Sequence, residues 1–209
     1  MAKMGLSKLV FSKYSATGNT VTYSEPVNTE KLAEYSTEFN SGDSNDLYLD
    51  NAVAESDVGT FSGGTINITV GGLTNETSKL ILGVTEQTIR YGDSSDVKEI
   101  VYDEQIEISE LGVGLIEMHK NNGVIFYRAV HLARVQFNIP NDSATTKGET
   151  VEWQTQEISG KILRSDHVDT KYVHPWKFTS DFDTEEKALE YLMYKGGKQN
   201  ESIVSRNRG

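Results

Sequence analysis

Apolar and polar residues alternate along most of the chain, which is the pattern of β-strands with one buried face. The clearest example is GGTINITVGG, where Ile66, Ile68 and Val70 alternate with threonine and asparagine between two glycine pairs. Residues Leu6–Phe11 alternate as well. They are followed by the turn sequence Ala-Thr-Gly-Asn and another alternating run, which predicts a hairpin. We therefore expect a mainly β protein.

The segment Val124–Ile139 differs from the other strands because both of its alternating faces are largely apolar. This pattern is typical of a central strand that is covered on two sides. The strand before it, Val113–His119, leads into Lys-Asn-Asn-Gly, and Asn-Gly is a strong signal for a tight turn. Another strand is predicted over Val151–Leu163. Its apolar phase changes between Trp153 and Ile158, which indicates a bulge or a change of sheet.

Two helices are expected beside the strands. The run Asn75–Gly83 predicts a short helix that ends at its glycine and packs through leucine and isoleucine. The run Ser180–Leu192 predicts a second helix, with Asp183 or Thr184 as its N-cap and acidic residues in its first turn. Lys195 and the glycine pair after it close this helix.

Together these elements predict two packed β-sheets, in a sandwich or barrel-like arrangement, with a short flanking helix and a C-terminal helix. We expect a single domain over residues 1–195 and a flexible tail over residues 196–209. Two connections are long. One is a hairpin over Leu32–Glu55 with its tip at Ser41–Asp46, and the other is a polar loop at about residues 140–148.

Composition narrows the possible functions. The 209 residues include no cysteine, which excludes disulfides, thiolate zinc sites and cysteine nucleophiles. No signal-peptide core or membrane-length apolar run is present in the sequence. The net charge of −11 disfavours ordinary nucleic-acid binding, because an acidic surface repels phosphates. The same charge suits a path along which DNA must slide, or it serves only to keep the protein soluble.

Candidate chemistry is sparse. Asp43, Asn45, Asp46 and Asp50 form the densest group of oxygen ligands, but their spacing does not fit an EF-hand and favours a solvated turn. The four histidines lack metal spacing, and His131 is interpreted as a core histidine with its hydrogen bonds satisfied. We expect no metal, no cofactor and no enzymatic activity. A pair of carboxylates that meets only in space, as in glycoside hydrolases, stays open.

The two tryptophans allow two interpretations. Trp153 and Trp176 are expected to be core or interface anchors, and a platform that stacks on sugars is the alternative. On the alternative, the chain is a carbohydrate-binding β-sandwich module of a tail tip or surface protein.

Several blocks of sequence resemble the major tail proteins of bacteriophages with long, non-contractile tails. No single motif is diagnostic, but their order and spacing match over most of residues 5–195. The blocks are GVIFYRAVHLARVQF (123–137), TKGETVEWQT (146–155), ISGKI (158–162), LYLDN (47–51), GGTINI (63–68) and FDTEEKAL (182–189).

The resemblance implies a structural protein of the virion. In that family, six copies form a ring whose inner sheets join into a continuous barrel. The rings stack helically into a tail tube through which DNA leaves the capsid. The implied partners are other copies of the chain, tape-measure, tip and terminator proteins, and DNA in transit, with no membrane. The protein would be made in the host cytoplasm and then reside in the tail tube.

Two sets of residues are candidates for this function. An acidic bore would keep friction on DNA low, and acidic residues on expected long strands are candidates to line it, namely Glu104, Glu107, Glu152 and Glu157. The two long connections are candidates for contacts between rings, through Ser41, Asp43, Asn45, Asp46, Asn141, Asp142, Thr145 and Lys147.

Overall fold

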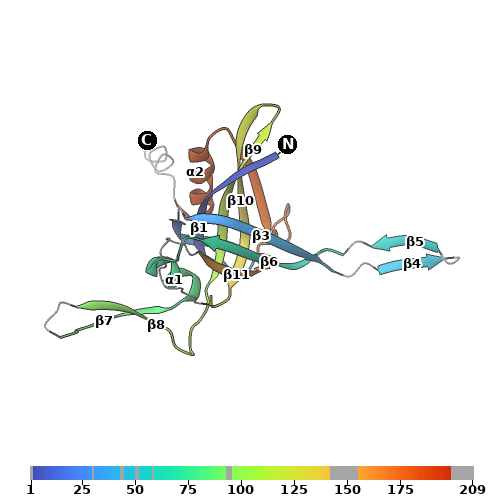
Figure 1. Cartoon of the computed structure of the whole chain (residues 1–209). Helices are drawn as coiled ribbons and strands as arrows, with labels where there is room; N and C mark the ends of the chain where they lie inside the picture. The colour runs from blue at the N-terminus through green and yellow to red at the C-terminus, as the bar shows by residue number, and fades with distance from the viewer. Residues whose placement is uncertain are drawn as a thin grey trace, which may run out of the picture.

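The structure is a computed structural model that describes residues 2–29, 31–42, 45–49, 52–57, 59–92, 96–141 and 155–198. Within these residues the chain is mainly β, as predicted, with two helices. Figure 1 labels the elements along the chain. They are β1 (Ala2–Thr17), β2 (Thr20–Thr29), β3 (Leu32–Ser41), β4 (Asn45–Leu49), β5 (Ala52–Asp57), β6 (Phe61–Val70), α1 (Asn75–Leu82), β7 (Thr85–Ile89), β8 (Val97–Val101), β9 (Glu110–Asn121), β10 (Val124–Phe137), β11 (Gln156–Leu163), β12 (Lys177–Phe182) and α2 (Glu185–Lys195).

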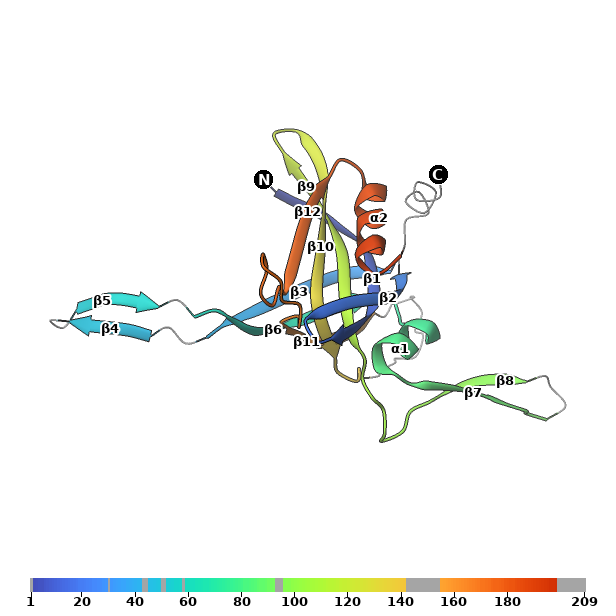
Figure 2. The same cartoon turned by 180° about the vertical axis from the view of Figure 1, so that it is seen from behind.

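Strand β10 organises the main sheet. The strand order is β2-β1-β9-β10-β11-β6-β3, and β12 also pairs with β10. Residues Tyr127–Leu132 of β10 pair with β12, whereas residues Arg134–Phe137 pair with β11. We call β2, β1, β9, β12 and the first part of β10 the first layer. The second layer consists of the last part of β10 with β11, β6 and β3 (Figures 1 and 2).

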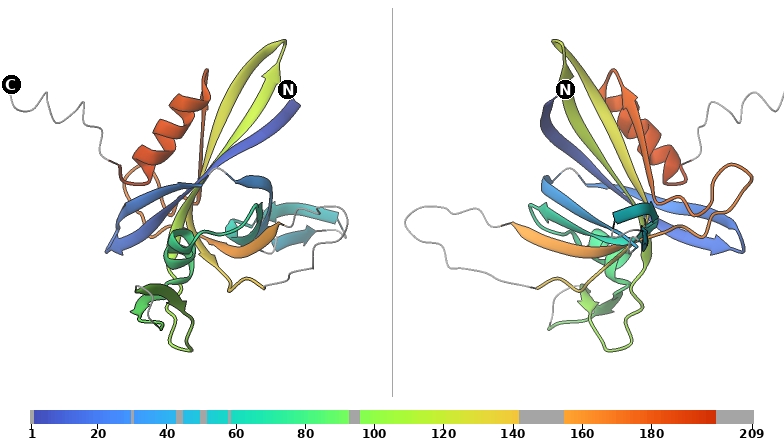
Figure 3. Two further views of the ribbon diagram at one scale, coloured as in Figure 1. Left: turned by 60° about the vertical axis from the view of Figure 1, so that its left-hand side comes forward. Right: turned by 90° about the vertical axis from the view of Figure 1, so that its right-hand side faces the viewer.

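The hydrophobic core brings the two layers together, which confirms the predicted packing of two sheet layers. Figure 3 shows β6 and β11 turning away from the long β9–β10 hairpin, with which they share the sheet. Helix α1 adds apolar side chains to the same core. The buried residues of this core include Leu9, Phe11, Ile66, Ile68, Val70, Leu80, Ile81, Leu82, Leu111, Val113, Leu132, Val135, Phe137, Ile158 and Ile162.

Helix α2 supplies a second apolar cluster. Ala188 and Leu192 of α2 are buried with Val10, Ile116 and Ala129 of the first layer. The middle of β10 is therefore buried on both of its faces, as its two-sided apolar pattern predicts.

The second helix starts later than expected. The sequence predicts a helix from Ser180, but the strand β12 continues to Phe182 and Thr184 is the N-cap. The Thr184 side chain accepts a hydrogen bond from the Lys187 backbone N–H. Half-buried and exposed residues alternate along β12, because every second side chain faces the protein.

The predicted tight turns and the first helix are confirmed. The β9–β10 turn has Asn122 and Gly123 at positive φ, as an Asn-Gly hairpin turn requires. Helix α1 is capped by Thr74 and ends at Gly83, whose φ of 68° is in the left-handed region. A β-carbon at Gly83 would lie 2.2 Å from the Glu107 carbonyl oxygen, so glycine is also needed for space.

The hairpin predicted over Leu32–Glu55 is longer and pairs differently. Strand β3 pairs with β6, not with the strand that follows it, and β4 pairs with β5 further out. The predicted tip at Ser41–Asp46 is therefore wrong, because β4 continues to Leu49 and its partner β5 begins only at Ala52. The alternating β6 provides the apolar face that β3 needs as a partner. We call β4 and β5 the outer hairpin, which projects from the body (Figures 1 and 2).

In the sequence, Ile100, Tyr102, Ile106 and Ile108 lie on one side of an alternating pattern that predicts a long strand, and this prediction is wrong. Only residues up to Val101 are strand, and they pair with β7 in a second projecting hairpin. The Asp103 side chain accepts a hydrogen bond from the Gln105 backbone N–H at 2.9 Å. This local turn interrupts the alternation, although Ile106 still packs against the core.

Candidate functional site

The outward side of the second layer is a continuous polar surface. Along β6 and β11 the isoleucines point into the core, so the residues between them face away from it. The strand register aligns these outward residues in three rows across β3, β6 and β11. We call this surface the polar face, and its rows are Glu34–Thr69–Glu157, Ser36–Asn67–Ser159 and Glu38–Thr65–Lys161.

All the side chains in the three rows of the polar face are polar. It has three carboxylates, one ammonium group and five small neutral side chains, which gives a net charge of −2 (one minus three). All nine residues are exposed or half-buried. The residue directly after β10 extends the face, because the Asn138 side chain donates to the Ser159 hydroxyl at 3.1 Å. Such a surface stays hydrated and repels phosphate groups.

One of the four acidic residues proposed for a bore lies on this face. Glu157 is in its first row, opposite Thr69. Glu104 and Glu107 are exposed but lie in the irregular segment after β8, so their expected placement on a long strand is wrong. Glu152 lies outside the described residues.

Sequence reasoning missed two acidic residues of the polar face. Glu34 and Glu38 belong to it because β3 pairs with β6. Their alternation with Tyr35 marks them as outward residues in the sequence. The signal was misassigned because the hairpin was expected to pair β3 with the segment directly after it.

The candidate residues for contacts between rings fall on two separate connections. Ser41 is exposed at the end of β3, and Asn45 and Asp46 begin the outer hairpin, opposite Asp57 and Ser56. On the other connection, Asn141 is exposed at the start of the predicted loop. The remaining candidates lie outside the described residues, namely Asp43, Asp142, Thr145 and Lys147.

An aromatic cluster lies at the base of the outer hairpin. The rings of Phe61 and Trp176 stack with centroids 4.3 Å apart, and Phe39 lies 4.7 Å from Trp176. The Lys177 ammonium lies over Phe39. Trp176 thus packs against aromatic side chains of β3 and β6, and Phe61 covers one face of its ring. Trp153, the other tryptophan, is outside the described residues.

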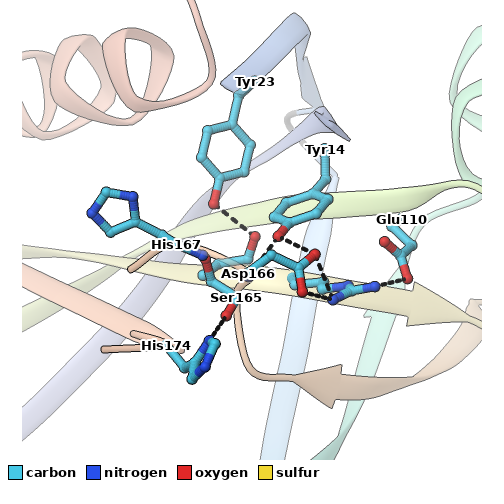
Figure 4. A network of polar contacts seen from close by, with 9 residues as sticks. Tyr14, Tyr23, Glu110, Ser165, Asp166, His167 and His174 are labelled. Carbon is cyan, nitrogen blue, oxygen red and sulfur yellow. Dashed lines mark hydrogen bonds and ion pairs between the residues drawn. The ribbon is translucent and has the colours of Figure 1, made fainter. Parts of the chain in front are cut away.

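A polar network joins the connection between β11 and β12 to the first layer (Figure 4). Arg134 donates to both oxygens of Asp166 and to Glu110. The Tyr14 hydroxyl donates to Asp166 and accepts from its backbone N–H, and burial raises the pKa of this tyrosine. The network holds the connection in place through paired charges.

His131 is buried, as predicted for a core histidine, but it is not fully satisfied. It is 2% exposed, and its Nε2 has no hydrogen-bond partner among the residues that the structure describes. Burial, and secondarily the nearby Lys195 ammonium, lowers its pKa to about 3, so the ring is neutral. Burial of the neutral imidazole costs less free energy than burial of the charged imidazolium would.

The described residues contain no group of three histidine, aspartate or glutamate side chains placed to hold a metal ion. Neither described helix is long and apolar enough to cross a membrane. Comparison of the chain with protein-family models and with curated proteins finds no match.

Proposed function

We propose that this chain is a structural, non-catalytic subunit of a bacteriophage tail tube, in which copies form rings that stack around a bore for DNA. The observation that carries the proposal is the polar face. A wall of carboxylates and small neutral side chains repels phosphates and offers them almost no cation to bind. DNA would therefore pass along such a wall with little friction.

The free sheet edges support ring formation. Strands β2 and β3 stand at the two ends of the strand order, so among the described strands each has one unpaired edge. An unpaired edge favours hydrogen bonding with another chain. Pairing between different edges of neighbouring copies is a head-to-tail contact, which closes into a ring when the rotation permits. The number of six copies comes from the family resemblance.

The two projecting hairpins support contacts between rings. The outer hairpin and the β7–β8 hairpin extend from different sides of the body (Figures 1 and 2). An isolated two-stranded hairpin is only marginally stable in water. The β7–β8 hairpin also exposes the apolar side chains of Ile89, Tyr91 and Val97. Contact with a neighbouring copy would cover these residues.

On this proposal the protein resides in the virion, and its partners are further copies together with tape-measure, tip and terminator proteins. Electron microscopy of the purified full chain over a concentration series tests the proposal. Rings or hollow tubes of uniform width are the expected result. Compact monomers at every concentration, at low and high salt, would contradict it. Saturable quenching of tryptophan fluorescence by a sugar in such monomers would support the carbohydrate-binding alternative.

A further inference from the structure

A pocket of about 310 Å³ lies where β2, β12, α2 and the connection between β11 and β12 meet. Aromatic and apolar side chains form most of its wall, among them Tyr23, Tyr172, Pro175 and Phe178. Lys195, in the last turn of α2, contributes an ammonium group to the same wall. The pocket is separate from the polar face, which lies on β3, β6 and β11.

Lys195 brings to this wall an ammonium group that forms no ion pair with a described carboxylate. Its Nζ lies 3.9 Å from the centroid of the Phe178 ring, and its side chain is half-buried. Among the described residues no carboxylate forms an ion pair with it. Burial accordingly lowers the pKa of Lys195. A partly buried ammonium group is stabilised when an anion is bound beside it.

The acidic residue that lines the pocket already has partners for both of its carboxylate oxygens. Asp169 Oδ1 accepts hydrogen bonds from the backbone N–H groups of Lys171 and Tyr172, at 2.7 and 2.6 Å. Its Oδ2 lies 3.0 Å from Nε2 of His167, which also lines the pocket. Asp169 is therefore committed to the connection itself. The pocket thus combines a free cation with aromatic walls, which suits a carboxylate on a short apolar stem.

The chain contains a segment with that chemistry. Strands β4 and β5 of the outer hairpin carry three acidic residues and no lysine or arginine. The outer hairpin projects from the body, which leaves it available for contact with a second copy (Figures 1 and 2). The three acidic residues are Asp46, Glu55 and Asp57.

We propose that the Lys195 pocket binds an acidic side chain from the outer hairpin of a second copy of this chain. The proposal rests on the proposed function, because it requires copies to assemble. It names the surface that receives the hairpin. A pocket of this volume accommodates a side chain and not a whole strand. The inserted side chain therefore adds specificity to a broader contact between the two copies.

A double-mutant cycle on assembly of the full chain tests the proposal. Lys195→Gln, and separately the neutralisation of all three acidic residues to asparagine or glutamine, should each raise the critical concentration for assembly about tenfold. Combining them should raise it no further, because both remove the same contact. Lys195→Arg should restore most of the assembly, and Lys187→Gln, on the exposed side of α2, is the matched control.

Each result separates this proposal from the proposed function. If the unaltered chain forms no rings or tubes, the proposed function fails, and this proposal with it. If the unaltered chain forms tubes and Lys195→Gln assembles at the same concentration, only the pocket proposal is overturned. Additive effects of the two changes also overturn it, since they would show that the pocket and the outer hairpin act on different contacts.

Discussion

The two layers of the sheet have opposite surroundings although they share one strand. The first layer is covered by the core on one side and by α2 on the other, so β10 is apolar on both faces there. The second layer has the core on one side only and presents the polar face on its other side. One layer thus serves stability on both faces, and the other leaves a whole face available for function.

The difference is visible in neighbouring residues of a single strand. On β6, Ile68 is fully buried whereas Asn67, the residue before it, is exposed in the middle row of the polar face. Strict alternation in the second layer therefore specifies both the residues of the core and the residues of the polar face. In the first layer the alternation disappears because both faces need apolar side chains.

The largest expected effect comes from breaking this alternation at its buried position. Ile68→Ala should lower the free energy of unfolding by about 2–5 kcal/mol, because it removes packed apolar volume and leaves a cavity. Asn67→Ala is the control and should change the free energy by less than about 0.5 kcal/mol. Urea denaturation of both variants measures the difference. Similar losses for the two would contradict the contrast between the faces.

A buried acid links the two layers. Glu117 of β9 accepts hydrogen bonds from Lys3 of β1 and from the Tyr35 hydroxyl of β3, and it lies 2.8 Å from His119 Nε2. Burial by itself would raise its pKa, but the bonds from Lys3, Tyr35 and His119 outweigh burial and lower the pKa to about 2. The ionised carboxylate therefore stabilises the contact between β3 and the first layer.

This link predicts a pH dependence of stability. Because the folded pKa of about 2 is below the ordinary value of 4.5, the stabilisation is fully present above pH 4.5 and is lost as the pH falls towards 2. Glu117→Gln should cost about 1–3 kcal/mol at neutral pH. It should also flatten the decline of stability between pH 5 and pH 3, measured by denaturation at each pH. An unchanged decline would mean that other carboxylates dominate it.

A smaller effect is expected at the start of α2, which covers the outer face of the first layer. Thr184→Ala should lower the free energy of unfolding by about 1 kcal/mol, because it removes the oxygen that caps the Lys187 backbone N–H. Asp183→Ala should cost less, since its ion pair with Lys187 is exposed. Thermal unfolding of the two variants orders them, and the reverse order would mean that Asp183 is the cap.

The sequence predicted elements better than their partners. Alternation located β6, β9 and β10, and the Asn-Gly turn joined the last two correctly. The pairing of β3 was missed because its partner β6 lies beyond the inserted outer hairpin, a contact that local pattern does not encode. In the segment after Val101, isoleucines continue to alternate, but the Asp103 turn ends the strand.

For the candidate site too, the strands were predictable from the sequence but their partners were not. Glu157 was a candidate because it lies on an expected long strand, and the strand pairing puts it on the polar face, whereas Glu34 and Glu38 required knowledge of the partner strand. The Lys195 pocket was not predictable, since its walls come from β2, β12, α2 and the connection before β12. Residues so far apart in the chain meet only through the tertiary fold.

Labelling of single cysteines in assembled protein tests most directly whether the polar face lines a bore. The chain has no cysteine of its own, so Asn67→Cys introduces one thiol, in the centre of the polar face. Before assembly it should react with both a small maleimide and a polymer-linked maleimide. In tubes it should react with the small reagent but not with the large one, which cannot enter the bore. Equal reaction with the large reagent in tubes and in free subunits would contradict the account.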